Sequence, residues 1–293
     1  MLKGKLHPYT TTLLATTALL LAACAPKPTA PVTGAAVSAD NIAIKYEVVG
    51  KGEPTLVFVH CWTCSRASWD AQATHFAPRY RIVRLDLAGH GESGRERTNY
   101  TIEAFAADVT AVVNKLDARK VILVGHSMGG PVAAEAAKQL GDRVIGVVGV
   151  DTFYTGFPMP KEQKQVDAML KPFADDFAGS AGKFMRGFFG PGADPALVDR
   201  IAANTAAADP KMAVNAMRNM IAWSQRNDPA LLETLGPRLR NINADPKGDA
   251  KPLHASVTLV TGAGHFIPQE KPVEFNRVLD GVVTELVVPA GNK

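Results

Sequence analysis

Residues 125–130, with the sequence GHSMGG, have the residue types and spacing that nucleophilic attack on a carbonyl carbon requires. They form a G-x-S-x-G motif around Ser127, directly after the apolar run VILV and directly before the helix-forming run PVAAEAAKQL. A serine at such a strand-to-helix turn sits on strained backbone, and the flanking glycines permit close approach of strand and helix. We therefore predict that Ser127 is a nucleophile and that the backbone N–H of Met128, at the start of the helix, stabilises the oxyanion.

The sequence GAGHF at residues 262–266 supplies a base for this serine. His265 follows a β-rich run and two glycines, a loop position from which its imidazole can reach Ser127. Two carboxylates are candidates for holding the Nδ1–H of His265: Asp151, which ends the run VIGVVGV, and Asp245, which follows residues 239–244. We favour Asp151, because its strand is unambiguous and because ligand chemistry gathers at the carboxyl edge of α/β sheets. Asp245 remains the alternative.

The elements that must position these residues alternate along the chain from residue 41. Short β-rich apolar runs, separated by helical stretches, span residues 42–49, 55–60, 81–87, 121–126, 144–150 and 256–261. Continuous apolar strands indicate a sheet that is covered on both faces. Residues 101–116 have apolar side chains at helical spacing after Thr101, a good N-cap residue, and predict a core-facing helix. The pattern predicts an α/β fold with a mostly parallel central sheet flanked by helices.

One long segment, residues 152–237, breaks this alternation. It contains helical pieces separated by Pro and Gly and no clear strand, which predicts a helical cap inserted between core segments 41–151 and 238–293. Seven of the 12 Phe and six of the eight Met fall in this segment. Most of them pack small helices together, and the remainder suit the adaptable wall of a pocket for an apolar acyl or aryl group.

Together these motifs resemble the α/β-hydrolase family, in its cap-bearing, esterase-like subgroup, from about residue 41 to residue 283. The segments VFVHCWTCSRASWD and DLAGHGES resemble two further motifs of that family. The resemblance implies that the backbone N–H of Trp62 is the second oxyanion donor, next to a Cys61 that replaces the usual glycine. It also implies structural roles for Asp86 and His90. On the acid the resemblance is divided, because the commoner family position corresponds to Asp245 and some subfamilies use the position of Asp151.

The reaction expected from these residues is hydrolysis of a carboxylic ester through an acyl-enzyme, with no cofactor and no metal. Serine rather than aspartate at position 127 argues against haloalkane dehalogenase and epoxide hydrolase chemistry, which in similar folds requires a carboxylate nucleophile. Lactonase, thioesterase, carbon–carbon hydrolase and perhydrolase activities remain alternatives on the same residues. A protein that only senses or carries an apolar ligand is an alternative of another class.

The N-terminus has the pattern of an exported bacterial lipoprotein. Lys3 and Lys5 precede the apolar residues 13–21, a stretch too short to span a bilayer but typical of a signal peptide. The sequence LAAC that ends at Cys24 resembles a lipobox, which predicts a signal peptide over residues 1–23 and a lipid on Cys24. Residues 24–40, rich in Pro and Ala, are then expected to form a solvated tether. Ala25 stands where an Asp would be a retention signal, and by resemblance to enteric lipoproteins this suggests the outer membrane, with the enzyme facing the periplasm.

Composition excludes other classes of partner. The net charge is +4, and the 32 basic residues are spread along the chain, so we expect no nucleic-acid partner. The seven His are scattered and no Cys/His set has zinc spacing, so no metal site is expected. Cys61 and Cys64 form a C-x-x-C pair outside a thioredoxin-like context, for which a structural disulfide and two free thiols both remain open.

Overall fold

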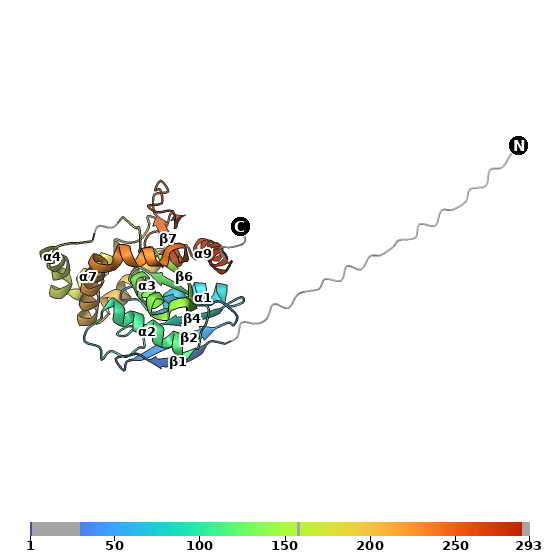
Figure 1. Ribbon diagram of the computed structural model, residues 1–293. Coiled ribbons are helices and arrows are strands. Elements are labelled where there is room, and N and C mark those ends of the chain that lie inside the picture. Colours follow the sequence, from blue (N-terminus) through green and yellow to red (C-terminus); the bar gives the residue numbers. More distant parts are fainter. Residues whose placement is uncertain (2–29, 157–158, 289–293) are drawn as a thin grey trace.

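A sheet of eight strands lies at the centre of the molecule, in the spatial order β1-β2-β4-β3-β5-β6-β7-β8 (Figure 1). The computed structural model describes Met1 and residues 30–156 and 159–288. The strands are β1 (Val32–Val37), β2 (Ala43–Val49), β3 (Thr55–Val59), β4 (Arg81–Leu85), β5 (Val121–His126), β6 (Val144–Val150), β7 (Leu239–Asp245) and β8 (Val257–Thr261). The pairs β1–β2 and β2–β4 are antiparallel, and the other neighbours are parallel. The predicted α/β fold with a mostly parallel sheet is confirmed.

The central strands are buried on both faces, which explains their continuous apolar sequences. In β3, Val57 and Val59 belong to one hydrophobic cluster, whereas Leu56 and Phe58 belong to another on the opposite face of the sheet. Side chains alternate between the faces of a strand, so a strand covered on both sides needs apolar residues at every position.

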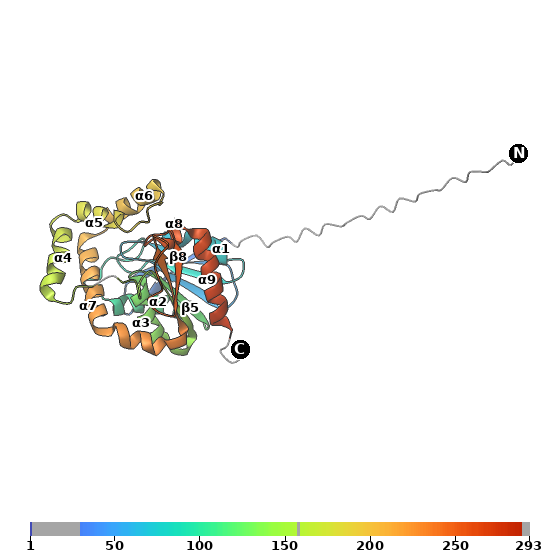
Figure 2. The same cartoon turned by 90° about the horizontal axis from the view of Figure 1, so that it is seen from above.

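Helices cover the two faces of this sheet (Figures 1 and 2). The helices are α1 (Asp70–Phe76), α2 (Ile102–Lys115), α3 (Gly129–Leu140), α4 (Gln163–Asp175), α5 (Phe177–Arg186), α6 (Pro195–Ala206), α7 (Pro210–Leu235), α8 (Ile267–Glu270) and α9 (Pro272–Val287). On one face α2 packs against α3, and on the other α1 packs against α9. The helix expected over residues 101–116 is present as α2, with the Thr101 side chain accepting the N–H of Ala104 at 3.1 Å.

The tether expected over residues 24–40 is wrong in its C-terminal half. Residues 32–37 form β1, which pairs with β2 along its whole length, and Ala36 and Ser38 are buried. Backbone hydrogen bonds to β2 stabilise this edge strand, so it needs few large apolar side chains and leaves a weak sequence signal. The folded domain therefore begins by residue 32. Cys24 and the segment before it lie outside the described residues.

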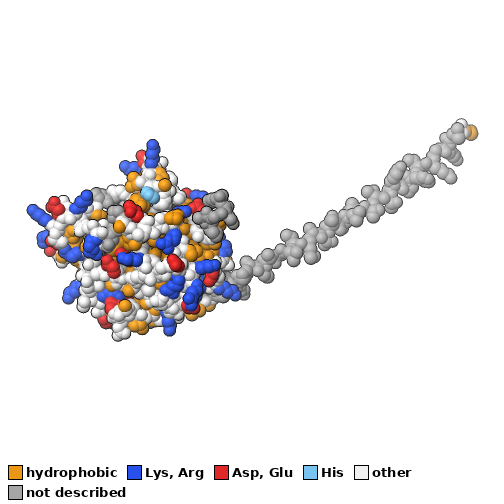
Figure 3. Space-filling model, viewed as in Figure 1, with side chains coloured by type: hydrophobic (Ala, Val, Ile, Leu, Met, Phe, Trp, Pro, Cys, Tyr) orange, Lys and Arg blue, Asp and Glu red, His pale blue; other side chains and the backbone are white. Residues whose placement is uncertain are grey.

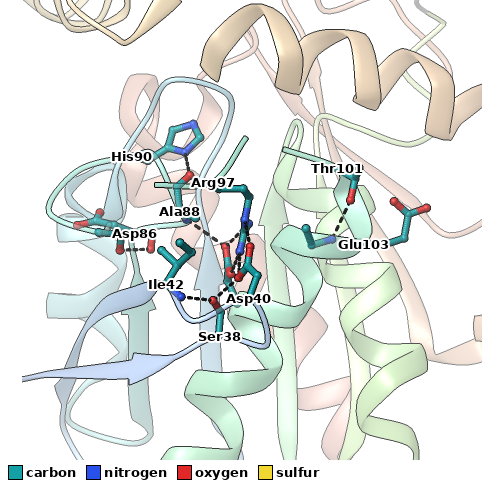
Figure 4. A network of polar contacts seen from close by, with 12 residues as sticks. Ser38, Asp40, Ile42, Asp86, Ala88, His90, Arg97, Thr101 and Glu103 are labelled. Atoms are coloured by element: carbon teal, nitrogen blue, oxygen red, sulfur yellow. Dashed lines mark hydrogen bonds and ion pairs between the residues drawn. The ribbon is translucent and has the colours of Figure 1, made fainter. Parts of the chain in front are cut away.

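A buried arginine joins this edge of the sheet to α2 (Figure 4). The Nη2 of Arg97 lies 2.6 Å from Oδ1 of Asp108, and its Nε lies 2.6 Å from Oδ2 of Asp40 in the turn after β1. The other oxygen of Asp108 accepts the N–H of Ala88 at 3.0 Å. Both charges of the Arg97–Asp108 pair are thus compensated, as buried charges must be. The network fixes the loop after β4.

Helices α4 to α7 occupy the chain between β6 and β7, within residues 152–237, which we term the cap segment. In Figure 2, α4, α5 and α6 arch away from the sheet at one end of the molecule, and α7 returns the chain to it. Asp194 and Asp209 begin α6 and α7 as N-caps, each followed by a proline at the first helical position. Among the described residues, no helix has the length and apolar character needed to cross a membrane.

Candidate active site

Ser127 lies on the sharp turn between β5 and α3. Its φ is 53°, a left-handed conformation that is strained for a residue with a side chain. The turn is held on both sides, since the N–H of Ser127 donates to the carbonyl of Val150 at 2.9 Å and its carbonyl accepts the N–H of Gly130 at 2.8 Å. A Cβ at Gly125 would overlap the carbonyl of Gly129. Gly125 is therefore required by the close approach of β5 and α3, and Gly129 by the close approach of α3 to β3, because a Cβ at Gly129 would overlap the carbonyl of Val59.

Asp151 and His265 meet at the carboxyl edge of the sheet. The Oδ2 of Asp151 lies 2.6 Å from Nδ1 of His265, and its Oδ1 accepts the N–H of Ala244 at 2.9 Å. The Asp151 backbone also has a positive φ, 44°, and its N–H donates to the carbonyl of Ile242. When Nδ1–H donates to Asp151, the Nε2 of His265 keeps a lone pair that can accept a hydroxyl proton.

Asp245 makes its hydrogen bonds elsewhere. It ends β7, and its Oδ1 accepts the N–H of Gly248 at 2.8 Å and that of Ala250 at 3.5 Å. These contacts close the turn after β7, which is the usual role of an aspartate ahead of Pro and Gly. Of the two carboxylates that the sequence offered, the structure thus brings Asp151 to His265 and gives Asp245 to a turn.

A clamp that the sequence analysis missed holds the loop of His265. The Oε2 of Glu270 accepts the N–H of Gly264 at 3.0 Å and that of Gly190 in the cap segment at 2.9 Å, and its Oε1 accepts the N–H of Phe266 at 3.1 Å. The N–H of His265 itself donates to the carbonyl of Phe188 at 2.7 Å. The His265 loop and the cap segment are therefore one hydrogen-bonded unit. The only sequence signal was a glutamate five residues after His265.

Ser127, His265 and Asp151 line a single cavity of about 500 Å³. The cap segment supplies most of its apolar wall, namely Met159, Met169, Phe184, Met185, Phe188, Met217, Met220 and Trp223. Thioether and aromatic side chains form an adaptable surface that suits apolar groups of varied shape. A few polar side chains, including Thr152 and Ser224, are set into this wall.

The two proposed oxyanion donors come from two different segments, Met128 from the residue after Ser127 and Trp62 from the loop after β3. Met128 is the N-cap residue of α3, where the first backbone N–H groups of a helix have no intrahelical acceptor. Trp62 follows β3 and lines the cavity together with Cys61. The indole Nε1 of Trp62 donates to the carbonyl of Ala213 in α7 at 2.8 Å, which fixes this residue against the cap segment.

The C-x-x-C pair is a disulfide, with the two Cα atoms 5.2 Å apart. The sequence left open a disulfide and two free thiols, and the structure has the disulfide. The φ of Cys61 is not positive, although this residue stands where glycine was expected; the left-handed residue of the turn is Thr63, with a φ of 57°.

Two neighbouring histidines brace the loops around the site in their neutral form. The Nε2 of His60 accepts the N–H of Leu87 at 3.0 Å, and the Nε2 of His90 accepts the N–H of Thr63 at 3.3 Å. Burial lowers the pKa of His60 to about 4 and that of His90 to about 3. Asp86 accepts the backbone N–H groups of Arg66 and Glu92 and pairs with the Arg66 guanidinium.

Solved structures of an esterase and of a bromoperoxidase resemble this fold over most of its length. A thermophilic esterase from Thermogutta terrifontis superposes with a TM-score of 0.74 and 21% sequence identity, covering 88% of this chain and 100% of the esterase. A bromoperoxidase from Bacillus anthracis superposes with a TM-score of 0.73 and 22% identity, covering 86% of this chain and all of the other. At identities this low, the superpositions establish a shared fold and nothing further.

Sequence comparison gives the family. A non-heme chloroperoxidase from Burkholderia pyrrocinia is 40% identical over 93 residues, which are 31% of this chain and 34% of that protein. The alignment thus spans only about a third of the relative's length. The family model described as "Alpha/beta hydrolase family" matches residues 56–278, which include Ser127, Asp151 and His265. The chain belongs to the alpha/beta hydrolase family.

Proposed function

We propose that this protein is a serine esterase that cleaves carboxylic esters with apolar acyl or aryl groups through an acyl-enzyme. The observation that carries the proposal is the Asp151–His265 hydrogen bond in the cavity that Ser127 also lines. A nucleophile on a strained turn, a base and a carboxylate that orients the base are the three parts that acyl transfer by serine requires.

The reaction follows from these parts. Ser127 Oγ attacks the ester carbonyl carbon as its proton passes to Nε2 of His265, and Asp151 stabilises the imidazolium that forms. The N–H groups of Met128 and Trp62 hold the oxyanion. His265 then protonates the departing alcohol. A water molecule, deprotonated by His265, attacks the acyl-enzyme and releases the acid.

The cavity supports the choice of substrate. A volume of about 500 Å³ with a wall of Met, Phe and Trp side chains favours an apolar group over a sugar or a phosphate. Burying each additional CH₂ contributes about 0.8 kcal/mol until the space is full. The kcat/KM for p-nitrophenyl esters is therefore expected to rise from acetate to medium chains and then to fall.

The test combines turnover with covalent labelling. The wild-type protein is expected to hydrolyse p-nitrophenyl esters with an initial burst and to react with a fluorophosphonate probe at Ser127. A ligand sensor would label without turnover, and a purely structural protein of the cell envelope would neither label nor hydrolyse the esters. Absence of ester turnover across the whole chain-length series would overturn the proposal.

Perhydrolysis is a second candidate on the same residues. It is favoured by the names of two similar proteins, a chloroperoxidase and a bromoperoxidase. In this reaction hydrogen peroxide, in place of water, attacks the acyl-enzyme and releases a peracid. Measuring peracid and acid formed from one ester at graded peroxide concentrations separates the candidates, because an esterase yields acid alone.

The proposed location follows from the N-terminal sequence. Cleavage before Cys24 and acylation of its thiol would attach the enzyme to a bacterial envelope membrane, with the outer membrane favoured by Ala25. Between Cys24 and β1 at Val32 the chain has seven residues, a short tether that would keep the domain close to the bilayer. Figure 3 shows acidic and basic side chains interspersed on one face of that domain.

A further inference from the structure

The Cys61–Cys64 disulfide closes a four-residue turn that contains Trp62, a residue of the active-site wall, and Thr63. The N–H of Cys64 also donates to the carbonyl of Cys61 at 3.1 Å, so the turn is tight. Inside it lies Thr63, whose φ of 57° is strained for a β-branched residue and persists only where its surroundings impose it. The disulfide is a covalent constraint on that conformation, and therefore on the backbone N–H of Trp62.

The same turn contacts the core and the cap segment. Trp62 is tied to α7 through Ala213, and the Thr63 hydroxyl lies 3.0 Å from the hydroxyl of Thr205 in α6. On the core side, the N–H of Thr63 donates to His90. A change of conformation in this turn would therefore displace the backbone N–H of Trp62. The turn contacts both the core and the cap segment, so the change would also alter its contacts with each of them.

The two cysteines face different cavities. Cys61, 2% exposed, lines the active-site cavity, whereas the half-buried Cys64 lines a second cavity of about 670 Å³. This second cavity lies between the C-terminal part of α6 and the loops after β3 and β4. A nucleophile that enters it meets the disulfide at Cys64.

The charged groups of the second cavity favour anions. Arg95 and Arg200 line it, and neither guanidinium is in an ion pair with a described residue; that of Arg95 donates to the carbonyl of Gly91 at 3.2 Å. The only carboxylate in the lining, Asp70, is paired with Arg84. His90 is neutral at pH 7, because burial lowers its pKa. The cavity therefore presents a net positive charge beside Cys64.

We propose that the second cavity is a thiol-exchange site, in which small anionic thiols open the disulfide at Cys64 and thereby release the oxyanion donor Trp62. A thiolate attacks Sγ of Cys64, the S–S bond breaks, and Cys61 leaves as a thiolate that takes up a proton. A second thiol attacks the mixed disulfide, which frees Cys64 and yields the oxidised thiol dimer. Two electrons pass from the two thiols to the protein. The effect on turnover rests on the proposed esterase function.

The exchange itself is tested without any turnover. The oxidised protein is treated with 3-mercaptopropionate, an anion, or with neutral 2-mercaptoethanol at equal thiolate concentration, then quenched with acid and mapped by mass spectrometry. A mixed disulfide on Cys64 is expected, with the anion reacting at least severalfold faster. In the Arg95→Gln/Arg200→Gln variant, whose two changes are at exposed positions, that preference should vanish. No adduct, an adduct on Cys61 alone, or equal rates for the two thiols in wild type would overturn the site.

The consequence is tested by ester turnover during reversible reduction. Reduction is expected to lower kcat by about tenfold or more. This loss should be smaller than the ~10²- to 10³-fold loss caused by deleting one oxyanion donor, because the donor is displaced and not removed. KM should change less than kcat, and reoxidation should restore kcat. Cys64→Ser should have the low kcat of the reduced protein and ignore thiols. Thermal melts of both forms check that the fold persists, and if Cys64→Ser does not fold, the wild-type titration gives the same readout. An unchanged kcat after complete reduction would overturn the positioning role, whereas inactivity of the oxidised wild type would count against the esterase function alone.

Discussion

The Oδ2 of Asp151 lies 2.6 Å from Nδ1 of His265, although 114 positions separate the two residues in sequence. Asp151 reaches this point because it directly follows β6, which pairs with β5, the strand that leads to Ser127. Its backbone there is left-handed, with a φ of 44°. A carboxylate that follows β6 and a carboxylate that ends β7 are the two alternatives for holding the Nδ1–H of His265. Here the second position is occupied by Asp245, which closes a turn.

Exchange of single carboxylates for amides tests this assignment. Asp151→Asn should lower kcat for ester hydrolysis by about 10³- to 10⁴-fold at neutral pH, because an amide neither holds the productive tautomer of His265 nor stabilises its imidazolium. Asp245→Asn is the matched control and should retain most activity, with some loss of thermal stability. A large loss for Asp245→Asn beside an active Asp151→Asn would reverse the assignment.

The nucleophile is tested by Ser127→Ala. Because the proposed chemistry passes through a covalent bond to Ser127, the variant should lose about 10³-fold or more in kcat and all fluorophosphonate labelling. Its thermal stability should not fall, since alanine removes only a hydroxyl from a strained turn. Near-normal turnover by a folded Ser127→Ala protein would contradict this mechanism.

Sequence periodicity was sufficient for the core of the fold. Strands buried on both faces, such as β5, are continuous apolar runs that few other structures accommodate. Strand β1 was missed because its residues, VTGAAV, are small and its stability comes from the backbone ladder with β2. An edge strand of this kind has no distinctive side-chain pattern.

The sequence predicts those site residues whose type is dictated by the chemistry of the reaction. It does not predict those whose role depends on contacts that form only in the folded chain. A nucleophile elbow requires its glycines in sequence, so Ser127 stood out. Glu270 did not, because its three N–H partners come from the loops around Gly190 and His265, which only the folded chain brings together. The disulfide was equally open, since the spacing of Cys61 and Cys64 does not fix the distance between them.

The Glu270 clamp should matter for turnover more than for binding. In Glu270→Gln the side chain keeps its length, but one acceptor oxygen becomes a donor that faces backbone N–H groups, so the His265 loop should loosen. We expect kcat to fall about tenfold with little change in KM, because a misplacement of about 1 Å near a catalytic group is enough to slow the chemical step. Glu274→Gln, in the first turn of α9, where the Glu274 carboxylate pairs with Arg277 at 3.7 Å, is the control. Equal kcat values for the two variants would remove the positioning role.

Membrane attachment is tested at the N-terminus. If Cys24 carries the lipid, the mature wild-type protein should partition into Triton X-114 and sediment with membranes, and its N-terminal peptide should carry the mass of acyl chains. Cys24→Ser should either remain unprocessed or appear in the soluble fraction. An unmodified N-terminal peptide from a wholly soluble wild-type protein would exclude the tether.

Acid stability should depend on three buried neutral histidines: His60, His90 and His126. Burial lowers the pKa of His60 to about 4 and of His90 to about 3, and it holds the pKa of His126 well below 6.5. In the unfolded chain these groups return to about 6.5, so between pH 6.5 and 4 the unfolded state binds more protons than the folded state. The stabilisation is fully present above pH 6.5 and is lost as pH falls through this window, by about 1.4 kcal/mol per pH unit for each histidine that remains neutral.

Removal of one of these histidines should therefore flatten the pH dependence. In His90→Gln, the free energy of unfolding from urea titrations should be lower than wild type at pH 7, because the bond to Thr63 changes, but should decline less between pH 6.5 and pH 4. The slope of the unfolding free energy against pH should differ between the two proteins by about 1.4 kcal/mol per pH unit, which corresponds to one bound proton. His75→Gln, at an exposed position on α1 beside Asp280, controls for the loss of an accessible imidazole. If His90→Gln and wild type lose stability in parallel over this range, then His90 is protonated within the folded protein and its role as a neutral acceptor for Thr63 is wrong.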